Sequence, residues 1–377
     1  MPETAENLKT ANMLLGFLSQ DPENANLKLD AGNALIAAGK YDDAIDLLGT
    51  VKADNELFLS ACNLKGEAAL RAQQFETALD AFKTIVDAGV TDSGVNFNVS
   101  WALTNLKEYD VALETLSDAA VQSIPQAAML KVQLEHQLGD FEAAETAARA
   151  AVERFPDHVG LMAAVSVLAL DIEDKDLAIK TAKVAADHPD GKTTIAMLAL
   201  DEGDINTAYA LFDEVVSDFP QKPRSWIGRG LSQLMLGNYD AGAEDLDRGA
   251  EIFGTHLGTW IASGWAYFVQ GKYDAARDRF QTAMNIDPNF SECHGSLAVI
   301  DLLNGDNESA SRRIKTALRL DSACFSAALA QSIFVGAQGK AELSHKIVEK
   351  AMSTPVNKSG QTLTDMLIRM NSGGTIH

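Results

Sequence analysis

Residues 257–288 read LGTWIASGWAYFVQGKYDAARDRFQTAMNIDP, and their spacing predicts two helices joined by a tight turn. The stretch carries, in order, Trp260-x2-Ser263-Gly264-x2-Tyr267, Gly271-Lys272-Tyr273, Ala276-x3-Phe280 and Pro288. Glycine accepts the positive φ at which a helix commonly ends, so Gly271 marks the turn. Ala276 is small enough to let the second helix approach the first closely, and Pro288 ends it because proline cannot continue a helix.

The same small residue recurs along the chain at a nearly constant period. The successive spacings are 34, 34, 32, 34, 30, 34, 34, 34 and 34 residues. An aromatic residue stands three positions before most of these anchors, as Tyr273 does before Ala276. The ten anchors are Ala44, Ala78, Ala112, Ala144, Ala178, Ala208, Gly242, Ala276, Ala310 and Ser344. A fixed period of this length is the signature of a repeat protein.

The repeated pattern resembles the tetratricopeptide repeat, a 34-residue helix–turn–helix unit with the signature Trp-x2-Leu-Gly-x2-Tyr, Ala-x3-Phe and Pro. In the stretch quoted above only the leucine position departs, being Ser263. The resemblance covers almost the whole chain. It implies an all-α fold, an α-α superhelical solenoid of about ten tetratricopeptide-like helix–turn–helix repeats with a capping helix at each end.

This register divides the chain into three parts. Residues 1–24 are expected to hold an N-terminal capping helix, 25–358 the repeats, and 359–377 a C-terminal capping helix with a disordered tail. We expect the repeats to be irregular near 159–222, where the sixth repeat is four residues short. That shortening predicts a first helix of about three turns or fewer in the sixth repeat.

The C-terminal capping helix is expected at Gln361–Met370, which is in phase as an eleventh first helix. Its apolar residues recur at i, i+3, i+4 and i+7 and form one stripe, namely Leu363, Met366, Leu367 and Met370. Such a stripe would shield the last apolar face of a repeat array.

Composition and charge narrow the possible partners. The chain has no apolar stretch of about 18 residues, so no membrane insertion is expected. Three widely spaced cysteines argue against a disulfide framework, and we expect a cytoplasmic location. Residues 1–250 contain 41 Asp and Glu against 19 Lys and Arg, whereas 251–377 contain 12 of each. Nucleic acid is therefore not an expected partner, because phosphate contacts need clustered cations.

No motif predicts catalysis, a cofactor or a metal. The run Asp190–Thr194 (DGKTT) resembles the end of a phosphate loop, but Ala186 stands where that loop needs glycine, so we interpret it as a turn between repeats. Cys293-His294 lacks the spacing of a zinc site, and His294 occupies the slot that Trp226 and Trp260 fill in the two preceding repeats. The basic cluster Arg312, Arg313, Lys315 and Arg319 is interpreted as a solvated helix face, with docking of an acidic partner as the alternative.

In proteins of this family the first helices line a concave groove, and their positions 2, 5, 9 and 12 face a bound peptide. Carried onto this sequence, positions 5, 9 and 12 are half polar in the first four repeats and have no polar residue in the last four. The alternative for part of position 12 is that these residues are buried between helices and do not face the groove. The peptide-binding residues implied by the resemblance are Asn33, Asn63, Glu67, Phe97, Asn98, Trp101, Gln133, Leu231, Ile261, Trp265, Phe268 and Val299.

Trp265 and Trp101 are the expected anchors for a ligand, since interface hot spots are enriched in tryptophan. Trp226 and Trp260, at position 4, are expected to belong to the core instead. The carboxylate clamp of chaperone-binding members is absent, because Leu29 stands where that clamp needs lysine and Gly94 and Asn98 replace later cations.

The sequence thus predicts a non-catalytic scaffold or adaptor that binds a protein or peptide partner in its groove. The alternative is a self-associating assembly protein, with head-to-tail contacts between its acidic N-terminal half and its charge-balanced C-terminal half.

Overall fold

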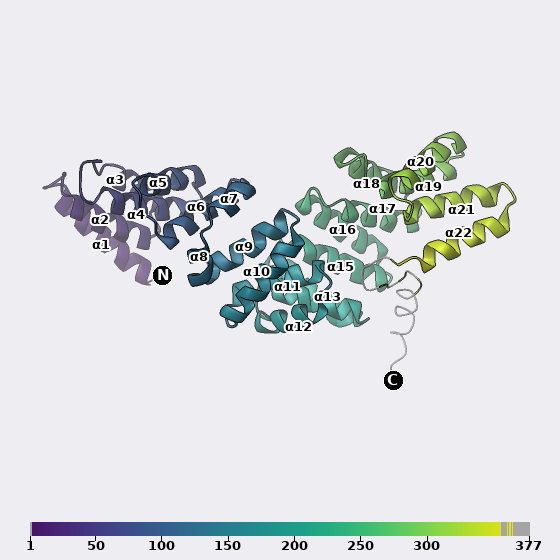
Figure 1. Ribbon diagram of the computed structural model, residues 1–377, viewed down its shortest axis with the longest axis horizontal. Helices are drawn as coiled ribbons and strands as arrows, with labels where there is room; N and C mark the ends of the chain where they lie inside the picture. The colour runs from purple at the N-terminus through teal and green to yellow at the C-terminus, as the bar shows by residue number, and fades with distance from the viewer. Residues whose placement is uncertain (1, 356–359, 361, 363, 365–377) are drawn as a thin grey trace. The chain divides into compact units, whose positions relative to one another are not determined.

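In the computed structural model, residues 2–355, 360, 362 and 364 are described. Within these residues the chain forms 22 helices and no β-strand, and most of the helices follow one another as antiparallel pairs (Figure 1). The all-α helix–turn–helix repeat fold predicted from the sequence is confirmed.

Ten helix pairs form the repeats, and we number them 1 to 10. Helix α1 (Pro2–Leu18) precedes them, near the helix expected at the N-terminus. The first helices of the repeats are α2 (Ala25–Ala37), α4 (Phe58–Arg71), α6 (Ser93–Asn105), α9 (Pro125–Gln137), α11 (Val159–Asp171), α13 (Pro189–Asp201), α15 (Pro223–Met235), α17 (Leu257–Val269), α19 (Ser291–Leu303) and α21 (Phe325–Ala337). The second helices are α3 (Tyr41–Leu48), α5 (Phe75–Asp87), α7 (Tyr109–Thr115), α10 (Phe141–Arg154), α12 (Lys175–Val184), α14 (Ile205–Asp218), α16 (Tyr239–Phe253), α18 (Tyr273–Ile286), α20 (Asn307–Leu320) and α22 (Ala341–Ser353). The short helix α8 (Asp118–Ser123) lies between repeats 3 and 4.

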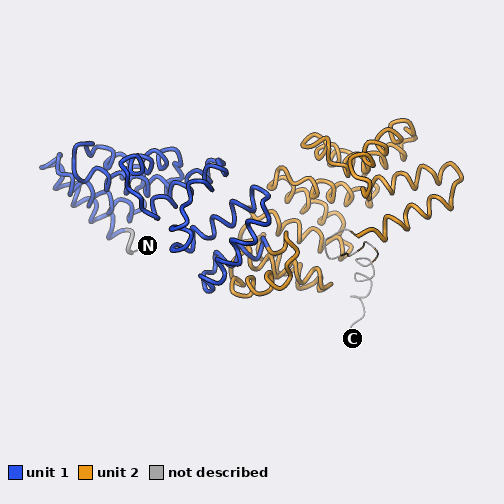
Figure 2. Tube along the Cα trace, in the orientation of Figure 1, with its two compact units in different colours: residues 1–168 blue, residues 169–377 orange. Residues whose placement is uncertain are grey.

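The chain divides into two compact blocks, Met1–Leu168 and Ala169–His377, coloured separately in Figure 2. We call them the N-terminal block and the C-terminal block. The boundary falls inside α11, so repeats 1 to 4 belong to the first block and repeats 6 to 10 to the second.

The turn between the two helices of a repeat is a left-handed C-cap. In repeat 8, Gly271 has φ 75° and the next amide, Lys272 N, donates to Tyr267 O at 3.1 Å. This hydrogen bond satisfies a carbonyl that the helix end would otherwise leave free. Repeats 2, 3 and 5 make the turn without glycine, with positive φ at Gln73, Lys107 and Glu173. The turn therefore persists in repeat 5, where its sequence signal is missing, at a steric cost of about 1–2 kcal/mol per residue.

Residues 16 positions apart occupy corresponding places in the two halves of each repeat, and they are in contact in repeats 1, 2, 7 and 8. At four of these pairs the first helix has glycine; a Cβ built on Gly264, for instance, would lie 2.3 Å from Phe280 Cε1. All members of the ten pairs are buried except Val348. The pairs are Gly32/Leu48, Gly66/Phe82, Ser100/Leu116, Val132/Ala148, Ser166/Ala182, Ala196/Phe212, Gly230/Leu246, Gly264/Phe280, Ala298/Ile314 and Ser332/Val348.

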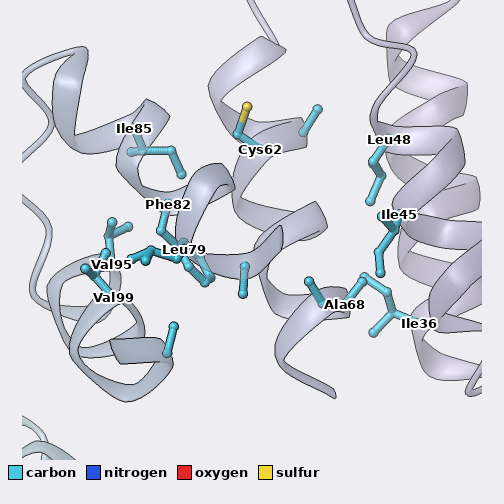
Figure 3. Close-up of a cluster of buried hydrophobic side chains, with 14 of the residues drawn as sticks. Ile36, Ile45, Leu48, Cys62, Ala68, Leu79, Phe82, Ile85, Val95 and Val99 are labelled. Atoms are coloured by element: carbon cyan, nitrogen blue, oxygen red, sulfur yellow. The ribbon is translucent and has the colours of Figure 1, made fainter. Parts of the chain in front are cut away.

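These pairs lie inside a core that continues from repeat to repeat. In the N-terminal block Phe82 and Leu79 of α5 meet Val95 and Val99 of the next first helix, α6 (Figure 3). Because a second helix such as α5 contacts both its own partner, α4, and the following first helix, α6, a repeat depends on its neighbours for burial.

The expectation of a short first helix in repeat 6 is wrong. Helix α13 has 13 residues, like most first helices, and the missing residues come from α12, which has only 10. Helix α13 starts at once because Pro189 occupies its first turn and His188 Nδ1 accepts from Asp190 N. A Cβ on Gly191 would lie 2.1 Å from Ala185 O, so the end of α12 lies directly against the start of α13.

The C-terminal end of the array has an open face within the described residues. Helix α22 has no buried residue, and Val348 is 36% exposed, whereas the equivalent Ile314 in α20 is 5% exposed. The four apolar residues of the capping helix expected at Gln361–Met370 lie outside the described residues, as does the tail that follows. None of the described helices has an apolar stretch long enough to cross a membrane.

We predict that adding a methyl group at the paired position destabilises the fold. In Gly264→Ala the new methyl would meet the fully buried ring of Phe280, which has no free space to move into. The free energy of unfolding should fall by about 1–3 kcal/mol, measured by denaturant titration followed by circular dichroism.

Gly16→Ala is the matched control, because a Cβ at Gly16 in α1 meets no atom within 4 Å. This substitution should leave stability unchanged or raise it by up to about 1 kcal/mol through helix propensity. Equal stability losses in the two variants would contradict the paired-position argument.

Candidate functional site

The C-terminal block contains an open apolar pocket of about 350 Å³ between α17, α19 and α21. Helix α17 contributes Gly258, Ile261 and Trp265, which are its positions 2, 5 and 9. The remaining lining residues are Phe290, Glu292, Phe325, Ser326 and Leu329. The pocket therefore lies on the face of the first helices that the family resemblance assigns to peptide binding.

Close packing of α19 against α21 shapes one side of this pocket. A Cβ built on Gly295 would lie 2.4 Å from Ala327 N, so only glycine allows the two first helices to come this near. A buried hydrogen bond from Ser296 Oγ to Ser326 Oγ, 3.1 Å long, joins them beside this contact. As a result Phe325 and Leu329 of α21 border the same pocket as α17.

Glu292 holds the start of α21 from the preceding repeat. Its carboxylate accepts hydrogen bonds from Phe325 N at 2.9 Å, from Ser326 N at 3.3 Å and from Ser326 Oγ. A carboxylate at a helix N-terminus satisfies free amides and interacts favourably with the helix dipole. The main polar group of the pocket is thus already used within the protein, which leaves an apolar surface for a ligand.

Trp265 forms an aromatic wall of the pocket. Its ring lies 5.0 Å from the Phe268 ring in an edge-on arrangement and 5.4 Å from the buried Phe280 ring. Ile261, 8% exposed, belongs to the same hydrophobic cluster. Aromatic packing of this kind fixes the indole and leaves its outer surface available to a partner.

Other groove residues predicted in the C-terminal block lie away from this pocket. Val299 is 1% exposed and packs with Ile314 in the core, so it cannot contact a partner, and we remove it from the predicted site. Phe268 stacks beside Trp265 and Tyr273 without lining the pocket, and Leu231 packs in a separate cluster with Ile227.

Five lining residues were not singled out from the sequence: Gly258, Phe290, Glu292, Phe325 and Ser326. Three of them occupy position 2 of a first helix, namely Gly258, Glu292 and Ser326. Phe290 and Phe325 lie at the helix starts. Helix position 2, which the family pattern names as groove-facing, is the signal that would have found Gly258, Glu292 and Ser326.

In the N-terminal block the predicted polar residues lie on four successive first helices, α2, α4, α6 and α9. Asn33 and Gln133 are exposed, while Asn98 is half-buried. Asn63 Nδ2 donates to Glu67 Oε1 at 2.8 Å, so part of their hydrogen-bonding capacity is satisfied internally.

The aromatic pair of that block lies on α6. Phe97 and Trp101 are half-buried, and their ring centroids are 6.3 Å apart. Both pack on the block's hydrophobic core with part of each ring exposed.

The expectation that Trp226 and Trp260 are core residues needs correction, because both are only half-buried. Each indole Nε1 donates to the carbonyl six residues earlier: Pro220 O at 2.9 Å and Gly254 O at 3.5 Å. His294 Nε2 makes the same contact with Pro288 O at 2.8 Å. This confirms that His294 fills the tryptophan slot, and it explains the residue without a metal.

Comparison with known families agrees with this geometry. Models described as tetratricopeptide repeat match residues 4–57, 63–128, 129–191 and 193–255. The chain belongs to the tetratricopeptide repeat family.

Two solved structures are similar in fold to this tetratricopeptide repeat protein. The crystal structure of the APC/C hetero-tetramer Cut9–Hcn1 matches with a TM-score of 0.51 and 13% identity, over 97% of this chain and 87% of that chain. The human IFIT1 dimer with m7Gppp-AAAA matches with a TM-score of 0.54 and 13% identity, over 92% and 94% of the two chains. At these identities the likeness concerns the fold alone. No curated protein matches the sequence.

The run that resembles a phosphate loop and the cysteine considered as a metal ligand both have structural surroundings in these tetratricopeptide repeats. Asp190–Thr194 lies within α13 and is not a turn: Asp190 accepts from Lys222 Nζ at 2.7 Å, and Lys192 pairs with Glu214. Burial raises the pKa of the Cys293 thiol to about 12. No three His, Cys, Asp or Glu side chains gather for a metal in the described part of the chain.

Two of the four residues in the basic cluster of α20 form ion pairs with carboxylates of the protein. Arg313 Nε donates to the buried Asp301 at 2.9 Å, and Arg312 pairs with Glu308 on its own helix. The two members Lys315 and Arg319 are exposed. The cluster therefore does not act as one cationic patch of four residues.

We predict that Glu292 stabilises the pocket end of the array. Glu292→Ala would remove the acceptor of two amides at the start of α21 and lower the free energy of unfolding by about 0.5–2 kcal/mol. Glu292→Gln should have an intermediate effect, because an amide oxygen still accepts but the charge is lost.

Hydrogen exchange provides the local measurement, since amides of α21 should lose protection in Glu292→Ala. Glu244→Ala serves as the control, because Glu244 is exposed on α16. Unchanged exchange in α21 would show that the cap has no stabilising role.

Proposed function

We propose that this protein is a non-catalytic interaction scaffold that binds an apolar face of a protein partner in the pocket between α17, α19 and α21. The observation that carries the proposal is that the pocket walls are free apolar surface, whereas its polar groups are already hydrogen-bonded within the protein. Ile261, Trp265 and Leu329 offer hydrophobic surface, whereas Glu292 and Ser326 already have partners within the protein.

The volume of about 350 Å³ is in the range of small ligand sites. Its walls come from three helices in succession, so a ligand would contact repeats 8, 9 and 10 together. An amphipathic helix fits such a surface, because it presents apolar anchors at i, i+3 or i+4, and i+7. Trp265 is the proposed anchor, since tryptophan is enriched among interface hot spots.

The first helices of the N-terminal block complement this pocket with polar groups. Asn33 and Gln133 are exposed and offer amide groups to a peptide backbone or polar side chain. Phe97 and Trp101 offer a partly exposed aromatic surface beside them. We propose that this face binds an extended polar segment of the same partner or of another.

A protein partner is favoured over nucleic acid by the excess of carboxylates in residues 1–250. The buried free thiols Cys62, Cys293 and Cys324 fit a reducing compartment, which supports the proposed cytoplasmic location.

We predict that filling the pocket blocks binding without harming the fold. Gly258 lines the pocket, and the nearest atom to a Cβ built there is 3.4 Å away, so a side chain is sterically tolerated. Gly258→Phe should weaken capture of the partner by about 30-fold or more, as expected for loss of a hot spot, with an unchanged melting temperature.

Gly258→Ala is the matched control, because a methyl group leaves most of the pocket open and binding should persist. Gly258 is preferred to Trp265 for this test, since truncating Trp265 would also disturb its packing on Phe280. Normal binding by Gly258→Phe would show that this pocket is not the working surface.

Self-association is the second candidate, supported by the two terminal helices. Helix α1 exposes Met13 and Phe17, at 53% and 51%, and α22 exposes Leu343 and Val348. A contact between the start of one copy and the end of another would cover both surfaces and would be heterologous, which allows chains of copies to grow.

This alternative predicts a molecular mass that rises with protein concentration, measured by light scattering. Phe17→Glu and Val348→Glu should each abolish the rise, because they place a charge in the contact. Val269→Glu, at a side chain that is 65% exposed in α17, should not. A constant monomer mass for the unaltered protein would exclude head-to-tail assembly.

A further inference from the structure

A second pocket lies in the N-terminal block, where the repeat pattern is interrupted. Helix α7 ends at Thr115 after 7 residues, and Ser117 starts the separate helix α8 by accepting a hydrogen bond from Ala120 N. Pro125 then begins α9. Two short helices thus take the place of one full second helix, and a pocket of about 630 Å³ lies between α8, α9 and α10.

The apolar part of the pocket wall is made of small side chains, and polar residues, among them Gln122 and Thr146, complete the lining. Ala128 of α9 faces a row of alanines on α10, and Val121 of α8 closes one end. The row is Ala143, Ala147, Ala150 and Ala151. Such a wall makes no hydrogen bonds through its side chains and leaves room for an unbranched hydrocarbon chain.

The carboxylate of Glu135 lines this pocket, and one of its two oxygens has no hydrogen-bond partner. Glu135 is 5% exposed, and its Oε1 accepts from Lys131 Nζ at 2.5 Å. Its Oε2 is buried without any hydrogen-bond partner. Buried polar atoms are nearly always satisfied, so an orphaned carboxylate oxygen lining a pocket points to a missing donor.

The other charged groups around the pocket favour a cation as that donor. Asp140 Oδ1 already caps α10 by accepting from Ala143 N, and Glu142 is exposed at the rim. The two cations have partners, since Lys131 is paired with Glu135 and Arg154 donates to Gln122 O at 3.3 Å. Carboxylates outnumber cations among the lining residues by three to two, so the local charge favours an incoming cation over an anion.

We propose that this pocket binds the side chain of a lysine from a protein partner. Its methylene chain lies along the alanines of α10, and its ammonium group donates to Glu135 Oε2. A compact ammonium suits a single open oxygen, whereas a guanidinium favours two parallel acceptors. The site is separate from the apolar pocket of the C-terminal block and does not depend on its function.

The test uses n-butylammonium as the probe, because it reproduces the end of a lysine side chain. The full-length protein with ¹³C-labelled alanine methyls is titrated and followed by NMR. Saturable shifts are expected at Ala143, Ala147 and Ala150. The neutral probe 1-butanol and the anion butyrate should bind at least about tenfold more weakly, since they lack the charge-assisted hydrogen bond.

Two variants separate the proposed contact from simple pocket filling. Glu135→Gln should weaken butylammonium binding by about tenfold or more, and Ala147→Leu should abolish it by occupying the cavity. Glu142→Gln, at the exposed rim, is the matched control and should bind within about threefold of the unaltered protein. Unchanged signals of alanines outside the pocket establish that the free variants are folded.

Three results would overturn the proposal. Equal binding of 1-butanol would show an apolar cavity only. Unchanged affinity in Glu135→Gln would show that the carboxylate is not the acceptor. The absence of saturable shifts with butylammonium would show that the pocket does not bind an ammonium group.

Discussion

The contact between residues 16 positions apart is the steric constraint that sets how closely the two helices pack in repeats 1, 2, 7 and 8. Where the first helix carries glycine, as at Gly66 and Gly264, the second carries a large side chain that fills the space of the missing Cβ. Repeat 4 reverses the sizes with Val132 and Ala148. Protein interiors are densely packed, so this match of volumes sets the distance between the helices and thereby the faces that each presents.

Polar contacts between repeats add specificity to this packing in the C-terminal block. Arg229 of α15 bridges Asp213 of α14 and Asp245 of α16, each at 2.7 Å. Although burial favours the neutral carboxyl, hydrogen bonds from Arg279, Ser263 and Tyr267 hold the pKa of Asp247 below its usual value. Because the folded-state pKa is depressed, this stabilisation is present above the usual pKa of aspartate and is lost as the pH falls through the lowered value.

Both candidate binding surfaces lie where the repeat departs from its regular form. Near α21 the departure is the close approach at Gly295, which brings Phe325 and Leu329 beside Trp265. At α8 it is the early end of a second helix, which leaves the alanines of α10 open. A regular array buries its apolar faces between neighbours, so it is the irregularities that leave apolar surface for a partner. One surface offers hydrophobic walls, and the other adds an unsatisfied carboxylate, Glu135, to such walls.

The sequence by itself determined the helix pairs, their turns and their register, because these depend on local signals such as Gly271, Ala276 and Pro288 and on a constant period. It also placed Ile261 and Trp265 on the face that borders the pocket. Only the tertiary structure decided that α12 and not α13 is shortened, since a spacing counts residues without assigning them to a helix. The same holds for exposure: Val299 and Trp265 occupy the same helix position, yet Val299 is buried by a neighbouring helix that approaches unusually closely. Burial and unsatisfied polar atoms arise between residues far apart in the chain, and a repeat pattern read along one helix does not contain them.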